Sequence, residues 1–70
     1  MQRYLVIIEK TKRNFSAYSP DLPGCIATGK NLREVKKNIH SAIQMHIQGL
    51  KEEGLPIPKA NTKAEFISIG

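Results

Sequence analysis

The apolar pattern between Leu32 and Leu50 constrains the fold more than any other feature, because only a helix can use a pattern of this length. Asn31, with Glu34 three residues later, is typical of a helix N-cap and its capping-box partner. Gly54 is placed to end the helix. The residues of the stripe recur at spacings of three and four and fill one wide side of a helical wheel: Leu32, Val35, Ile39, Ala42, Ile43, His46, Ile47 and Leu50.

Short apolar stretches ahead of this helix predict three strands. "RYLVIIE", residues 3–9, is apolar on both faces, which is typical of a central strand in a sheet covered on two sides. One cover is the helix, and the other could be a second subunit. "FSAYS", residues 15–19, alternates and pairs with the first strand as a hairpin across the polar turn "KTKRN". "CIAT", residues 25–28, follows a turn and is predicted to be an edge strand.

The segment after the helix predicts a last strand. "LPIPK" must be extended, because each proline disfavours the helical conformation of the residue before it. "AEFISIG", residues 64–70, then places Ile67 and Ile69 on one face and Phe66 on the other. A right-handed crossover would return this strand beside the first one. We therefore expect an α+β fold of order β-β-β-α-β, with one long helix across a four-stranded sheet.

The length of 70 residues predicts a single domain, residues 1–70, that is too small to be very stable alone. A core of this size seldom contributes more than ~3–5 kcal/mol. The single cysteine cannot form an intramolecular disulfide, so we expect a homo-oligomer, most simply a dimer. The apolar run Tyr4–Ile8 is too short for a signal peptide or a membrane span. We expect a cytoplasmic protein without membrane association.

The candidate catalytic residues are better explained by structure than by chemistry. A nucleophilic cysteine needs a base and an electropositive setting, whereas Cys25 begins an apolar strand and resembles a small buried side chain. Asp21 has no second carboxylate near it in the pattern, so we expect it to hold its turn by bonding a nearby amide. His40 and His46 lie about 120° apart on the helical wheel and cannot share a metal ion. We expect no enzyme, no cofactor and no metal site.

The charge leaves a second function class open. Eleven basic against six acidic residues give a net charge of +5 and a pI near 9.7, a balance that favours an anionic partner such as nucleic acid. Arg33, Lys37 and Lys51 fall within about 40° on the helical wheel and are the candidate nucleic-acid contacts. The alternative, a solvated flank beside the apolar stripe, is favoured because no exposed aromatic residues are predicted to stack bases.

One resemblance carries the sequence further. Residues 15–58 contain the motif P-D-L-P-G-C, then A-T-G, a helix with N-I-x-x-A-I and H-x-x-G-L, and finally E-E-G-x-P-I-P. This combination resembles the HicB family of antitoxins, and the flanking strands fit as well. The first motif, Pro20, Asp21, Leu22, Pro23, Gly24 and Cys25, is hereafter the PDLPGC loop; it is a candidate partner surface.

The resemblance implies a partial RNase H-like sheet without catalytic carboxylates. It also implies a partner, a small HicA-like ribonuclease toxin whose active site the antitoxin covers. Family members often add a C-terminal DNA-binding domain; because this sequence stops at Gly70, direct DNA binding is not expected. A charge of +5 adds little attraction to a basic RNA-binding toxin. A stand-alone relative without a toxin, or a small basic nucleic-acid-binding protein, is therefore the alternative.

Overall fold

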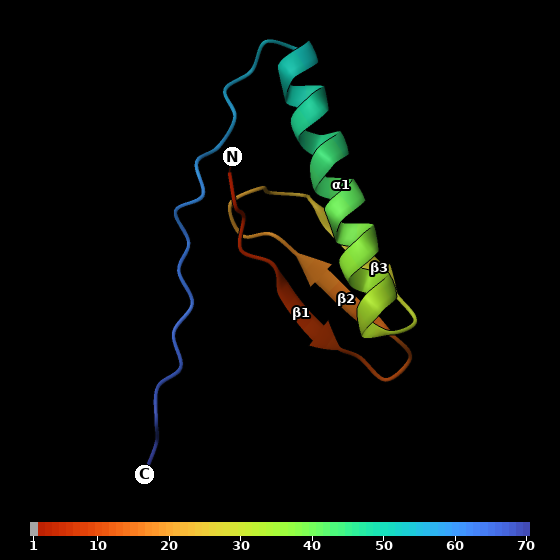
Figure 1. Ribbon diagram of the computed structural model, residues 1–70, viewed down its shortest axis with the longest axis vertical. Coiled ribbons are helices and arrows are strands. Elements are labelled where there is room, and N and C mark those ends of the chain that lie inside the picture. Colours follow the sequence, from red (N-terminus) through yellow and green to blue (C-terminus); the bar gives the residue numbers. More distant parts are fainter. Residues whose placement is uncertain (1) are drawn as a thin grey trace.

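The computed structural model describes residues 2–70 and has three antiparallel strands followed by one long helix. The elements are β1 (Ile7–Lys10), β2 (Phe15–Tyr18), β3 (Ile26–Gly29) and α1 (Leu32–Glu52). The strands form a meander in the order β1-β2-β3, and α1 crosses one face of the sheet (Figure 1). The α+β class and the β-β-β-α arrangement are confirmed.

The sheet pairs in a register that separates an inner face from an outer face. Ala17 lies opposite Ile8 on β1 and Ala27 on β3; Ala17 belongs to the core, and the other two side chains pack against it. On the other face, Tyr18 lies opposite Ile7 and Ile26. The alternation predicted for residues 15–18 therefore directs Phe15 and Ala17 to the core and leaves Tyr18 on the outer face.

The core lies between α1 and the sheet and is small. Its buried apolar members are Ala17, Leu22, Cys25, Val35 and Ile39. The helix rests over β3 and β2, not over β1, and the Asn38 side-chain amide donates a 2.7 Å hydrogen bond to the Thr28 carbonyl of β3. This placement leaves one end of the sheet, at β1, uncovered by the helix.

Both ends of α1 follow the sequence prediction. The Asn31 side chain accepts a 2.8 Å hydrogen bond from the Glu34 amide, as an N-cap does. The Glu34 carboxylate accepts in return from the Lys30 amide, one residue earlier than in the standard capping box. At the other end Gly54 has a φ of 69°, and the Leu55 amide donates to the Leu50 carbonyl, which completes a Schellman motif.

The predicted last strand does not form. Residues 55–70 follow the helix as an extended segment with no helix or strand, and this segment runs past the N-terminus and ends beyond the sheet (Figure 1). The prediction that residues 64–70 return beside β1 of the same chain was wrong, because strand-like alternation describes a side-chain pattern and does not say which backbone the strand will bond. The first strand consequently lies at an edge of the sheet and not at its centre.

None of the helices within residues 2–70 is long and apolar enough to cross a membrane.

Candidate functional site

The PDLPGC loop connects β2 to β3 through two consecutive tight turns. The Leu22 amide donates to the Ser19 carbonyl at 3.1 Å, and the Cys25 amide donates to the Leu22 carbonyl at 3.0 Å. Pro23 and Gly24 occupy the central positions of the second turn, and Gly24 has a φ of 83°. This is the arrangement of a type II turn, in which proline fixes the first central residue and glycine permits the positive φ of the second.

The loop is anchored from below by buried side chains. Leu22 is fully buried and Cys25 almost so, and both belong to the core. Ser19, also buried, donates a 3.0 Å hydrogen bond from its hydroxyl to the Leu5 carbonyl beside β1. The exposed part of the loop is therefore the turn at Pro23 and Gly24, on a base that packing holds in place.

Asp21 bonds a distant residue instead of its own turn. Its carboxylate accepts from the Thr62 hydroxyl at 2.8 Å and from the Thr62 amide at 3.2 Å. We predicted a nearby amide as the partner, and that prediction was wrong because backbone carbonyls already accept from the turn amides. Together with a 2.6 Å hydrogen bond from the Tyr4 hydroxyl to the Pro58 carbonyl, Asp21 fixes the path of the C-terminal segment.

Removing the Asp21 carboxylate is expected to loosen this segment and to leave the core intact. In Asp21→Ala we expect faster hydrogen exchange at the Thr62 amide and a loss of about 0.5–1.5 kcal/mol in the free energy of unfolding. Thr62→Val is the matched variant, since it removes the partner hydroxyl. The two losses should not add in the double variant. Unchanged exchange at the Thr62 amide in Asp21→Ala would instead show that this carboxylate does not hold the segment.

Cys25 is buried, in agreement with the structural role favoured above, and its surroundings do not favour a nucleophile. Burial raises the pKa of the Cys25 thiol above its ordinary value of 9.0, because the thiolate would lose its hydration. A nucleophilic cysteine needs the opposite shift. His40 and His46 both lie on α1, and residues 2–70 contain no group of three or more metal-ligating side chains that could hold an ion.

The raised pKa predicts a decline in stability at alkaline pH. Between the unfolded and folded pKa values the unfolded chain releases the Cys25 proton and the folded chain keeps it. The free energy of unfolding that this thiol contributes is therefore complete below pH 9 and is lost as pH rises through the folded pKa. Denaturant titrations of the native protein and of Cys25→Ala between pH 7 and pH 11 should differ in this slope. An identical slope in both proteins would contradict the prediction.

The three candidate nucleic-acid contacts are exposed but do not form one patch. Arg33 and Lys37 lie in the first two turns of α1, with Lys36 beside them, whereas Lys51 lies in the last turn. At a rise of 1.5 Å per residue, Lys51 is about 21 Å along the axis from Lys37. The intervening positions on this side are His40 and Gln44. The three cations share an angle on the helical wheel without sharing a site.

An apolar surface adjoins the PDLPGC loop on the outer face of the sheet. Tyr18 and Ile26 lie opposite one another there and are 42% and 65% exposed. With Pro20, Pro23 and Gly24 they line a shallow hollow of about 330 Å³. Sequence reasoning identified the loop but not this surface, although the alternation of residues 15–18 contained the signal for Tyr18.

The comparisons with known proteins assign the family. Residues 4–68 match the family described as the HicB-like antitoxin of bacterial toxin–antitoxin systems. The chain belongs to the HicB-like antitoxin family. One chain of a solved HicA3 and HicB3 toxin–antitoxin complex is 35% identical to it and superposes with a TM-score of 0.73 over 86% of this chain and 70% of the other.

Two relatives illustrate the range of lengths in which this HicB-like sequence occurs. The UPF0150 protein Ta0767 of Thermoplasma acidophilum is 38% identical, and the alignment covers 96% of both proteins. An uncharacterised 14.9 kDa protein of Haemophilus phage HP1 is 35% identical over 93% of this chain. This chain spans about half (49%) of the phage protein's length.

Proposed function

We propose that this HicB-like chain is a cytoplasmic inhibitory protein that neutralises a HicA-like ribonuclease toxin by covering the active site of the toxin. The observation that carries the proposal is the similarity to a chain of the HicA3 and HicB3 complex, which extends over 86% of this chain. The family match over residues 4–68 supports the same role. Inhibition of this kind needs a complementary surface and no chemistry.

The proposed contact surface is the PDLPGC loop together with the adjoining outer face of the sheet. Its backbone is held by two turns, so little ordering is needed on binding. Tyr18 and Ile26 offer exposed apolar area beside Pro23, and aromatic anchors next to a shallow hollow are typical of binding hot spots. The net charge of +5 favours an apolar contact over electrostatic attraction to a basic toxin.

The absence of a catalytic role is part of the proposal. Asp21 is engaged with Thr62, and the thiol of Cys25 is buried with a raised pKa. Neither group is arranged as a nucleophile or a general base.

The test begins with affinity purification of the tagged protein from its native cytoplasm and mass spectrometry of whatever co-purifies. We expect a small HicA-like protein in stoichiometric amount, whose ribonuclease activity an excess of the chain abolishes. Ile26→Asp should weaken this inhibition at least tenfold. Met45→Asp is the matched control, because Met45 is 75% exposed on α1 and lies outside the proposed surface.

Two results would overturn the proposal. If the purified toxin kept its activity in an excess of the chain, neutralisation would be refuted. If nucleic acid alone were recovered, with binding that weakens steeply as salt rises, the basic nucleic-acid-binding alternative would replace it.

A further inference from the structure

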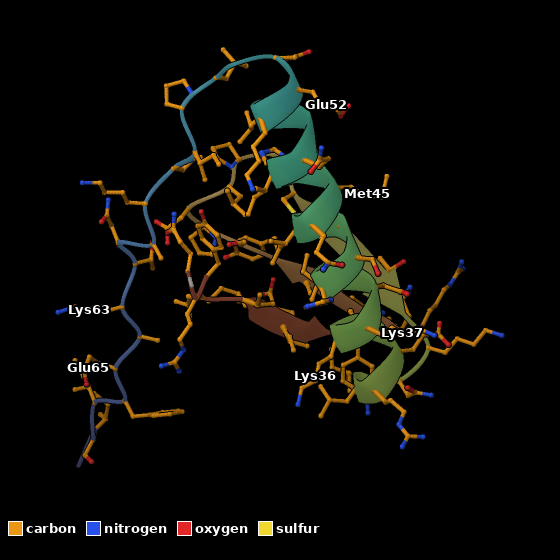
Figure 2. The ribbon with its side chains drawn as sticks, turned by 45° about the horizontal axis from the view of Figure 1, so that its top comes forward. Lys36, Lys37, Met45, Glu52, Lys63 and Glu65 are labelled. Atoms are coloured by element: carbon orange, nitrogen blue, oxygen red, sulfur yellow. The ribbon has the colours of Figure 1, made fainter. Side chains whose placement is uncertain are left out.

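The C-terminal arm, residues 63–70, carries apolar side chains that nothing in the described chain covers. Phe66, Ile67 and Ile69 are almost completely exposed, at 106%, 79% and 92% of their reference areas. The arm stands apart from the sheet in both views, and Lys63 and Glu65 lie far from the labelled helix residues in Figure 2. The radius of gyration is 13.6 Å, whereas a compact chain of this length has one of about 11 Å.

An unpaired strand edge and an apolar groove lie elsewhere in the described chain, and both could receive an apolar extended segment. The outer edge of β1 has no strand partner within residues 2–70, and the helix does not reach over it. An open groove of about 910 Å³ lies between this edge and α1. Its apolar lining comes from both elements: Tyr4, Val6 and Ile8 on one side, and Ile39, Ile43 and Ile47 on the other.

The arm fits this place in its apolar pattern. Residues 4–8 are apolar on both faces, so a neighbouring strand must also be apolar on both faces. The arm meets this requirement, since Phe66 points to one face and Ile67 and Ile69 to the other when the backbone is extended. The charged residues of the arm are Lys63 and Glu65, whose charges cancel, so the fit rests on the apolar pattern.

The contacts of the preceding residues direct the arm away from its own body. Tyr4 holds the Pro58 carbonyl and Asp21 holds Thr62, so residues 58–62 are fixed beside the start of β1 and the PDLPGC loop. From Thr62 the chain continues outward, past the sheet (Figure 1). A partner that offers the same open edge, and whose own arm needs the same cover, is a second copy of this chain.

We infer that two copies exchange their arms. Residues 64–69 of each copy pair with the outer edge of β1 in the other and cover its groove, which supplies the fourth strand that the sequence pattern predicts. A closed twofold exchange satisfies both open edges at once. The inference concerns the chain alone and does not depend on a toxin.

The experiment compares the wild type with Phe66→Asp and Ile67→Asp by light scattering during size exclusion over a range of protein concentrations. Both residues are exposed in the single chain, so these variants should keep the helical circular dichroism of the wild type. We expect a wild-type dimer whose dissociation constant rises at least about 30-fold in each variant, the effect of losing one interface hot spot. Met45→Asp should leave the dimer unchanged, because Met45, 75% exposed on α1 (Figure 2), does not line the groove.

Hydrogen exchange at the amides of residues 64–69 gives the second measurement. We expect strong protection in the dimer and rapid exchange in Phe66→Asp. A wild-type monomer would overturn the inference whether or not the arm amides were protected, because protection in a monomer means docking on the same chain. A dimer that both arm variants leave intact would overturn it as well.

Discussion

Alanine at position 29 is expected to cost about 3 kcal/mol, which is most of the free energy of unfolding of so small a protein. Gly29 ends β3, where the chain turns into α1, and a Cβ there would meet the backbone nitrogen of Val35, with the Val35 Cα at 2.7 Å. These are backbone atoms of the first helical turns, so no side chain can rotate to make room. Overpacking costs about 1–3 kcal/mol and occasionally more, and a core of this size contributes only ~3–5 kcal/mol in total.

The measurement is urea denaturation followed by circular dichroism, with Gly49→Ala as the matched control. Gly49 lies within α1, and a Cβ there would meet nothing within 4 Å. Alanine is a better helix former than glycine by about 1 kcal/mol, so this variant should be more stable than the wild type. The two variants should therefore change the free energy of unfolding in opposite directions. If Gly29→Ala were as stable as the wild type, the close approach of β3 and α1 would be wrong.

Leu22→Ala is the second variant with a large expected effect. Leu22 is the largest fully buried side chain, and it joins the PDLPGC loop to a core with few other members. Leucine-to-alanine substitutions in cores cost about 2–5 kcal/mol, through lost burial and the cavity left behind. We therefore expect Leu22→Ala to show no cooperative thermal unfolding transition above room temperature.

Leu55→Ala tests whether burial of the leucine causes the large loss of stability expected in Leu22→Ala. Leu55 follows the helix and is 48% exposed, so the same substitution there should cost less than about 1 kcal/mol. Differential scanning calorimetry of both variants gives the comparison. If the two losses were similar, the PDLPGC loop would owe its conformation to its turns and not to the leucine beneath it.

Local patterns in this sequence predicted local structure well. The stripe from Leu32 to Leu50 is a helix with Asn31 as its N-cap and Gly54 just after its end, because each signal depends on residues within one or two turns. The strands Phe15–Tyr18 and Ile26–Gly29 were also predicted within a residue, since Gly and Pro mark the turns between them.

Long-range partners were not predictable in the same way. The hydrogen bonds between Asp21 and Thr62 join residues 41 positions apart, and neither residue type nor spacing indicates the other. The pattern of residues 64–70 correctly indicates an extended chain with two apolar faces, but not which backbone it pairs with. A helical wheel gives Arg33 and Lys51 the same angle but records no distance along the axis, so it could not show that the two lie at opposite ends of α1.

The meander of strands has a consequence for the order of events when the chain folds. Every strand pairs with the next one in sequence, and the helix follows at once, so the body closes only short loops. Short loops carry a small closure entropy and permit rapid folding. The contacts that define residues 7–52 should therefore form at a rate independent of protein concentration, and they do not require residues 63–70 to have found a partner. Any later contact of those residues with another molecule is a separate, bimolecular event, whose rate the cell sets through the amount of the protein it makes.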